Sequence, residues 1–199
     1  MKKNLLKLVA LVAFVVVLAS CAKVPQVEID AAKAAIEAAK AGSADRYVPE
    51  TFNAANDSLN AALAETETQN AKFVLFRNYD HVKALVVSAT ETANKAAVET
   101  VAKKEEVKKE VEASLAEIAT VIAANKELLK KAPRGKDAKA ALEQINQEIA
   151  VVETAASEVT ASLAAGEDFL TLRDKINPAK EKANAIKAEL EEVVAKKKK

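Results

Sequence analysis

One short segment gathers side chains that can exchange protons and bind anions. Arg77, Tyr79, Asp80 and His81 lie within five positions, and His81 is the sole histidine of the 199 residues. A histidine beside a carboxylate can serve as a general base, but no nucleophile turn, oxyanion loop or phosphate-binding glycine motif accompanies it. We therefore expect the segment to start a helix, with a polar cap and Tyr79 packed inward. The alternative is a contact to a small ligand or a partner.

The other residue types that do chemistry are too few to form a site. With one His and one Cys, the chain lacks the ligand cluster that is typical of zinc centres. We predict no metal, no cofactor and no enzymatic activity. The enzymatic alternative is a cell-wall hydrolase, or an assistant to one, that depends on His81.

The single cysteine, Cys21, ends the most apolar stretch of the chain. Three lysines, Lys2, Lys3 and Lys7, precede the uncharged residues 8–19. About twelve helical residues reach about 18 Å, whereas the hydrocarbon core of a bilayer is about 30 Å thick. Residues 1–20 therefore have the pattern of a secretory signal peptide rather than of a permanent span.

The residues directly before the cysteine, Leu18, Ala19 and Ser20, resemble the lipobox of bacterial lipoproteins. The resemblance implies that the signal peptide is cut before Cys21 and that Cys21 carries diacylglycerol and acyl chains. Two or three such chains anchor a protein stably. Ala22 stands where Asp would retain the protein at the inner membrane, which implies the outer membrane with the body facing the periplasm. The alternatives are an ordinary signal peptide or a retained anchor, with an incidental cysteine.

Composition favours long helices and argues against nucleic-acid binding. The chain has three Gly, four Pro and no Trp, and half of its residues are hydrophobic. The net charge is +1, and removal of the three signal-peptide lysines leaves about −2, without the basic face that nucleic acids require. Scarce aromatic residues also disfavour a roomy ligand pocket.

Few helix breakers divide the first half of the chain. We expect a tether over residues 21–27, a helix over 28–41 ended by a left-handed Gly42, a loop over 43–48, and a second helix with Pro49 in its first turn. Four consecutive large apolar residues at 73–76 cannot share one helical stripe. They predict a bend between Lys72 and Asn78 and a new long helix from Tyr79. The alternative is one unbroken helix.

The second half shows three apolar seams with steps of three and four residues. The first runs from Val107 through Asn125 to Leu129, the second from Leu142 to Leu163, and the third from Leu172 to Val193. Breakers at Pro133–Gly135 and Gly166 separate them, which predicts antiparallel helices with coiled-coil-like packing. We expect Asn125 to be a polar group that fixes register. Pro178 either kinks the last helix or follows a fresh start capped by Asn177.

A shift of ninety residues aligns the helix from Tyr79 with the last helix. The aligned pairs are Tyr79 with Phe169, Val82 with Leu172, Val86 with Ile176, Ala89 with Ala179, Glu91 with Glu181, Ala93 with Ala183 and Asn94 with Asn184. The shift predicts a helical hairpin used twice, with chance similarity in an Ala-rich chain as the alternative.

The chain resembles an uncharacterised family of alanine-rich, tetratricopeptide-like bacterial lipoproteins. The resemblance rests on the lipobox and on two turns between Ala-rich helices, at residues 42–50 and 76–80. The resemblance covers residues 28–100 and implies a location and an all-α fold, but no activity. A weaker likeness, to the Braun-type outer-membrane lipoprotein, rests on the lipobox and the terminal Lys199. That family is much shorter and forms a simple trimeric coiled coil.

Two lysine-rich runs are expected to be mainly solvated. In residues 103–110 the spacing predicts that Lys109 pairs with Glu105 and Glu106. The tail Lys196, Lys197, Lys198 and Lys199 complements the negative end of the preceding helix. Its functional alternative is contact with an anionic surface or with peptidoglycan.

Together these patterns predict an all-α protein, an elongated antiparallel bundle of coiled-coil hairpins. The predicted parts are a signal peptide (1–20), a lipidated tether (21–27), a hairpin region ending in a long helix (28–131), and antiparallel helices packing on that helix (132–199), including the basic tail 196–199. The expected function is a lipid-anchored, periplasm-facing spacer or scaffold that binds envelope proteins or peptidoglycan, with oligomers through coiled-coil faces as an option. The alternative is a periplasmic chaperone or adaptor with helical grooves.

Overall fold

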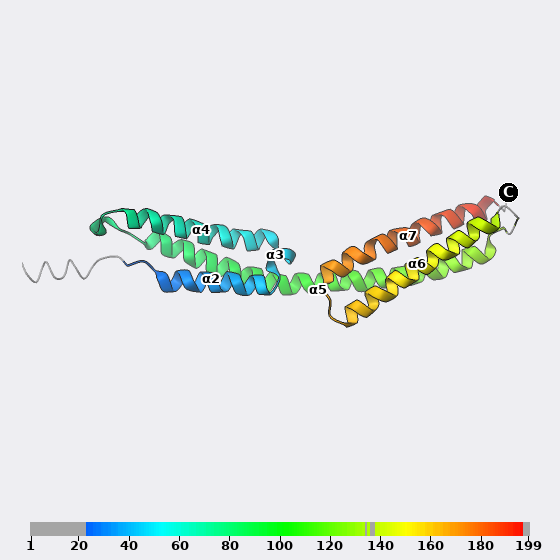
Figure 1. Cartoon of the computed structure of the whole chain (residues 1–199), viewed down its shortest axis with the longest axis horizontal. Helices are drawn as coiled ribbons and strands as arrows, with labels where there is room; N and C mark the ends of the chain where they lie inside the picture. Colours follow the sequence, from blue (N-terminus) through cyan, green and yellow to red (C-terminus); the bar gives the residue numbers. More distant parts are fainter. Residues whose placement is uncertain (1–22, 134, 136–137, 197–199) are drawn as a thin grey trace, which may run out of the picture. The chain divides into compact units, whose positions relative to one another are not determined.

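The computed structural model describes residues 23–133, 135 and 138–196, which form helices and turns without a strand among them (Figure 1). The all-α prediction is confirmed. The helices are α2 (Gln26–Ala41), α3 (Ala44–Tyr47), α4 (Pro49–Ala71), the 3₁₀ helix η1 (Val74–Phe76), α5 (Asp80–Lys131), α6 (Ala138–Ala164) and α7 (Phe169–Lys196). None of the described helices has both the length and the hydropathy to cross a bilayer.

The chain forms two compact units that divide between Ala102 and Lys103. Unit 1 contains α2, α3, α4 and the first part of α5, and unit 2 contains the last part of α5 with α6 and α7. The predicted boundary at 131/132 therefore differs from the division of the structure, which falls within the long helix.

Unit 1 packs α2, α4 and the first part of α5 around a core in which alanine is the commonest residue. The Thr51 hydroxyl donates a hydrogen bond of 2.7 Å to Glu99. Near the other end of α4, the Tyr79 hydroxyl donates to the Asn70 side chain at 2.6 Å. These two bonds join opposite ends of the helices, so α4 and α5 run antiparallel within this unit. Alanine suits this packing because its small side chain lets helices approach closely.

The helices of unit 1 are interrupted where the sequence predicted, but the left-handed residue after α2 differs from the prediction. Pro49 begins α4, as predicted, because its missing N–H and fixed φ suit the first turn. The break at residues 72–79 is also confirmed, so the alternative of an unbroken helix is wrong. Gly42 has φ −74° and stays right-handed, whereas Ser43 takes the left-handed conformation with φ 74°. The predicted loop after it contains the short helix α3.

The three apolar seams predicted for the second half of the chain face the core of unit 2. Its core includes Val111, Ile118 and Ile122 from α5, with Ile149 from α6 and Ile176 from α7. Ion pairs join the helices on the surface, including Lys182–Glu148 at 2.7 Å and Lys180–Glu117 at 2.6 Å. The helix α7 continues through Pro178, so a fresh helix start at Asn177 is excluded.

Asn125 is fully buried in unit 2, as the interrupted seam predicted. Its side-chain Nδ2 donates a hydrogen bond of 2.9 Å to the carbonyl of Ala183. Its Oδ1 accepts none from the residues that the structure describes. A polar group of this kind favours one register of α5 against α7, because sliding the helices would break its single bond.

The ninety-residue offset relates buried positions in the two predicted hairpins. Helix α4 begins at Pro49 and α6 at Ala138, while α5 begins at Asp80 and α7 at Phe169, so the helix starts agree with the offset to within one residue. The inward positions also correspond, as the pairs Ala55/Ile145, Leu59/Ile149, Ala62/Val152, Gln69/Val159, Val82/Leu172, Val86/Ile176, Ala96/Ile186 and Thr100/Leu190 are buried in both units. The corresponding positions lie in α4 and α5 of unit 1 and in α6 and α7 of unit 2, which supports the predicted helical hairpin used twice.

Candidate functional site

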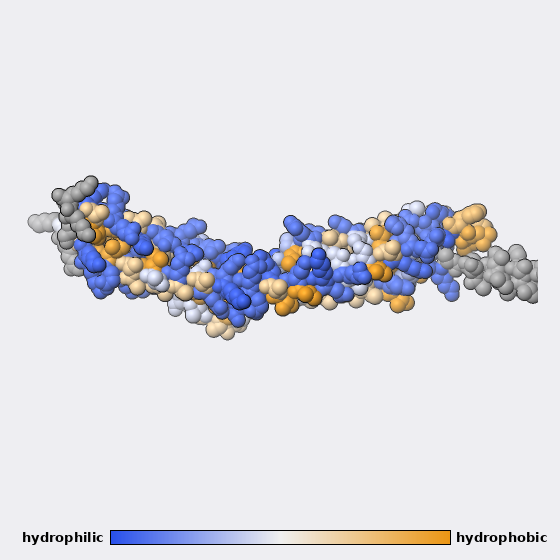
Figure 2. Space-filling model, turned by 180° about the vertical axis from the view of Figure 1, so that it is seen from behind, coloured by the Kyte–Doolittle hydropathy of each residue, from blue (hydrophilic) through white to orange (hydrophobic). Residues whose placement is uncertain are grey.

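The turn between α4 and α5 exposes four consecutive large apolar side chains, which we call the apolar tip. The exposed fractions are 67% for Phe73, 37% for Val74, 56% for Leu75 and 75% for Phe76. The two phenylalanine rings have centroids 6.3 Å apart and are tilted by 52°. Figure 2 shows an orange hydrophobic cluster at the end of unit 1. Contiguous exposed apolar side chains of this kind mark protein or membrane contacts.

The backbone under the apolar tip is held by Arg77. Its Nε donates a hydrogen bond of 3.0 Å to the carbonyl of Lys72, and its Nη2 donates one of 2.8 Å to the carbonyl of Asn70. Within the tip, the N–H of Phe76 donates to the carbonyl of Phe73 at 2.8 Å, forming η1. These bonds satisfy backbone groups of the turn and leave the apolar side chains directed outward.

A second set of bonds fixes the start of α5. The N–H of Asn78 donates to the side-chain oxygen of Gln69 at 3.0 Å, and Asn78 Oδ1 accepts from the N–H of Asp80 at 2.7 Å. The Tyr79 ring is buried while its hydroxyl reaches Asn70. The predicted polar cap and inward-facing Tyr79 are confirmed.

Most of the polar residues that suggested chemistry make structural contacts. Arg77 binds backbone carbonyls, Asp80 lies 3.8 Å from the ammonium of Lys83, and His81 is exposed on the first turn of α5. Among the described residues, no group of three His, Cys, Asp or Glu side chains is arranged to hold a metal ion.

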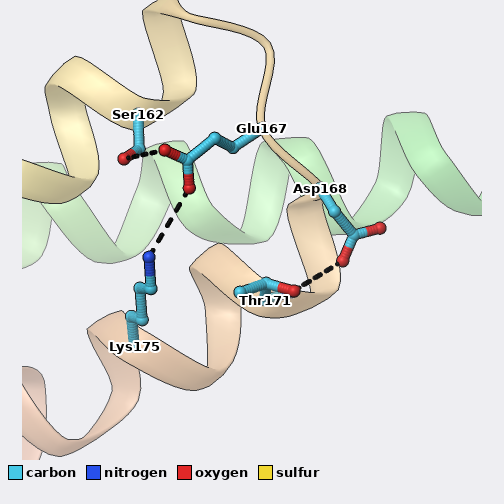
Figure 3. Close-up of polar contacts among 5 residues, drawn as sticks. All are labelled: Ser162, Glu167, Asp168, Thr171 and Lys175. Carbon is cyan, nitrogen blue, oxygen red and sulfur yellow. Dashed lines mark hydrogen bonds and ion pairs between the residues drawn. The ribbon is translucent and has the colours of Figure 1, made fainter.

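The corresponding turn of unit 2, between α6 and α7, has a different character (Figure 3). Ser162 donates a hydrogen bond of 2.7 Å to Glu167, which also lies 3.5 Å from the ammonium of Lys175. Asp168 accepts from the N–H and the hydroxyl of Thr171, at 3.0 and 2.8 Å. Gly166, with φ 79°, ends this helix. A polar turn closes this repeat, so the fold does not require an apolar one.

The apolar tip and the start of α2 lie at the same end of unit 1 (Figure 1). The 23 residues of α4 outnumber the 16 of α2, and seven additional helical residues add about 10 Å. Val24 packs against the core of unit 1, so only the three residues from Val24 back to Cys21 can extend, and they span at most about 10 Å. Cys21 is therefore within reach of the level of the apolar tip.

The remaining predicted site residues lie at the ends of the chain. Leu18, Ala19, Ser20 and Cys21 are outside the described residues, as are Lys197, Lys198 and Lys199. Lys196 is the last residue of α7, and its ammonium lies 2.6 Å from Glu192. The hydrogen bond from Lys196 lowers the pKa of the Glu192 carboxyl.

The charged run at 103–110 pairs differently from the prediction. The ammonium of Lys103 lies 2.9 Å from Glu106, and no described contact joins Glu106 or Glu105 to Lys109. Both side chains of the observed pair are well exposed, so this segment is a solvated helix face.

Unit 2 has a shallow groove of about 460 Å³ between α5 and α6. Leu115, Ile118 and Ile122 contribute apolar surface to it, and an ion pair between Lys126 and Glu153 crosses it. Alanine and small polar residues complete the lining, so the groove offers limited depth to a bound segment.

Sequence reasoning used residues 73–76 only to place a helix break and missed their exposure. The available signal was their position between Lys72 and Arg77 at a hairpin turn, because a buried turn segment would not be flanked by two cations. Comparison of the chain with protein-family models, curated proteins and solved structures finds no match.

Proposed function

We propose that the chain is a lipid-anchored structural protein of the bacterial cell envelope. Cys21 carries diacylglycerol and acyl chains, and the helical body serves as a spacer or scaffold that binds envelope partners. The lipobox residues Leu18, Ala19 and Ser20 and the basic n-region before them support the anchor.

One structural observation carries the proposal: the folded body begins almost at the lipidated residue. Val24 packs against the core of unit 1, and Pro25 is buried beside it. Only two residues separate Cys21 from this packed segment. A lipid on Cys21 would therefore hold the adjoining end of unit 1 close to the bilayer, with little freedom for the body to drift away.

The proposed location is the periplasmic face of the outer membrane, because Ala22 follows the cysteine where a retention signal would place Asp. The proposed role is non-enzymatic. Peptidoglycan, through the basic tail that begins at Lys196, or another envelope protein is the proposed partner at the far end of the chain.

An adaptor that binds other chains is the second candidate. The groove between α5 and α6 favours it, because apolar side chains of Leu115, Ile118 and Ile122 line an open surface. Co-purification of unfolded client proteins, lost in an Ala119→Lys variant and retained in an Ala113→Lys variant outside the groove, would distinguish the adaptor from a spacer.

The anchor is tested by mass spectrometry of the protein released from purified envelopes, with both termini read from one sample. We expect acyl chains on Cys21 in the wild type and full-length, unprocessed chain in a Cys21→Ser variant. A muropeptide on Lys199 would make the protein a two-ended tether, and an unmodified C-terminus would leave a one-ended anchor. A mature protein with an unmodified cysteine would refute the proposal.

A further inference from the structure

We propose that the apolar tip (Phe73–Phe76) inserts into the interfacial layer of the same membrane leaflet that holds the lipid on Cys21. The inference rests on the proposed lipid anchor and extends it, because it gives unit 1 a second attachment. Two separated contacts fix the orientation of unit 1 on the membrane, whereas a flexible lipid link alone leaves it free to rotate.

The position of the tip supports a membrane as its occupant. It lies at the end of unit 1 where α2 begins, and α4 carries it about 10 Å beyond that start. The three residues from Val24 back to Cys21, about 10 Å when extended, are long enough to bring both the lipid and the tip to one surface. A bilayer that receives the acyl chains is therefore within reach of Phe73 and Phe76.

The side chains around the tip match the chemistry of a lipid interface. Two phenylalanines, a valine and a leucine provide apolar surface of the kind that interfacial segments bury at the level of the acyl chains. Lys72 is exposed next to them in the chain, and Arg77 adds a second cation at the base of the turn. Cations at this depth attract anionic headgroups. The nearest carboxylate on the α5 side, Asp80, already has Lys83 as an ion-pair partner.

The size of the tip argues against a protein partner. Stable protein interfaces bury roughly 800 Å² on each side, formed by some twenty or more residues. The apolar tip has four residues, and the residues behind it are polar: Gln69, Asn70, Lys72 and Asn78. Four side chains are too few for such an interface but suffice for an insertion that supplements a covalent lipid.

The repeated unit supplies an internal comparison. At the same place in unit 2, Ser162, Glu167 and Asp168 close the turn with polar contacts. The unit whose turn lies near the lipidated residue has the apolar turn, and the other unit does not. This difference between the two turns is expected if the tip contacts the membrane. It is not expected if the apolar residues are needed for folding, because the turn of unit 2 forms without them.

The chain has no tryptophan, so a single Phe76→Trp substitution gives a site-specific fluorescent probe. The full lipidated protein would be purified from bacterial membranes and reconstituted into vesicles of phosphatidylethanolamine and phosphatidylglycerol with acyl-chain-brominated phospholipid. Val98→Trp on α5 is the matched control, because Val98 is 73% exposed and Phe76 is 75% exposed. Val98 lies eighteen residues, about 27 Å, along α5 from Asp80. Circular dichroism would check that both variants are folded, and mass spectrometry would check their acylation.

In acylated protein we expect the emission of Trp at position 76 to shift to the blue and to be quenched by the brominated lipid, with neither effect at position 98. Acylated, vesicle-bound protein with an unquenched probe at position 76 would overturn the inference while leaving the anchor intact. A blue shift without quenching would mean that protein covers the tip, which also overturns it. Protein that lacks acyl chains would refute the proposed anchor. If such protein still showed quenching at position 76, insertion of the tip would be supported without the anchor. If it showed no quenching, both the anchor and the insertion would be refuted.

Discussion

The hydroxyl of Tyr79 donates a hydrogen bond of 2.6 Å to Oδ1 of Asn70, joining the start of α5 to the last turn of α4. The ring of Tyr79 is buried in the core of unit 1, while Asn70 is exposed. This bond closes the base of the turn that presents the apolar tip. The equivalent residue of unit 2 is Phe169, which has no hydroxyl, so the bond is a feature of the first unit alone.

A Tyr79→Phe substitution should lower the free energy of unfolding by about 0.5–1.5 kcal/mol, the range for loss of one hydrogen bond. The loss should fall at the low end, because water can replace the hydroxyl at the exposed Asn70. Urea denaturation followed by circular dichroism would measure it. Tyr79→Ala is the contrast, with an expected loss of about 3–5 kcal/mol from the vacated core. Equal losses for the two variants would show that the buried ring contributes nothing beyond the hydroxyl, and no loss in the Phe variant would show that the bond contributes nothing.

The apolar tip should be dispensable for folding. A Phe73→Ser and Phe76→Ser double variant should change the free energy of unfolding by less than about 0.5 kcal/mol, because both rings are mostly exposed. Phe52→Ala is the matched control: its ring is buried in the same unit, and its removal should cost about 3–5 kcal/mol. Thermal unfolding of the three proteins would compare them. A large loss in the double variant would assign the tip to the core instead of to a surface contact.

The sequence predicted the helices of this protein well because its breakers are few and act locally. Pro49 begins a helix for reasons that depend on one residue, and the four apolar residues at 73–76 violate the helical period whatever surrounds them. The seams of unit 2, with Asn125 at the vacant position, predicted burial because each step of three or four residues returns to the same helix face.

The errors arose where neighbouring elements decide the outcome. Gly42 was expected to be left-handed, but the chain places that conformation at Ser43, one residue later, where helix α3 must begin. The predicted partners of Lys109 fit helical spacing, but exposed ion pairs are weak enough for rotamer preference to choose others. Exposure of the apolar tip depends in part on the length of α4 relative to α2, which the flanking cations Lys72 and Arg77 do not encode.

Replacement of Asn125 by Leu should raise the free energy of unfolding of unit 2 by about 1 kcal/mol. The substitution loses the bond to the Ala183 carbonyl but removes a buried oxygen without a described partner, which costs about 1–3 kcal/mol. Denaturant unfolding would measure the gain. Asn125→Asp is the control, and it should be destabilised by about 3 kcal/mol because it places a carboxylate without a cation in the core. A less stable Leu variant would indicate that the amide has a second partner, such as a buried water.

Unit 2 should lose stability in acid because two of its interhelical ion pairs need ionised carboxylates. The hydrogen bond from Lys180 lowers the pKa of Glu117, and that from Lys182 lowers the pKa of Glu148, both from an ordinary value of 4.5. A carboxyl whose pKa is lower in the folded state binds protons more readily when unfolded. The stabilisation is therefore complete above the unfolded pKa and is lost as the pH falls through the folded value.

A Glu117→Gln and Glu148→Gln double variant should consequently be less stable than the wild type at pH 7, and the difference should shrink as the pH falls toward about 3. Denaturant unfolding between these pH values would show the two curves converging below about pH 5. Added salt should narrow the difference at pH 7, because both pairs are solvent-exposed in part and are screened. Glu112→Gln is the control, because Glu112 is an exposed carboxylate on α5 without a described ion pair. The stability of this variant should follow the wild-type curve. Parallel curves for the double variant and the wild type would show that neither pair holds α7 against its neighbours.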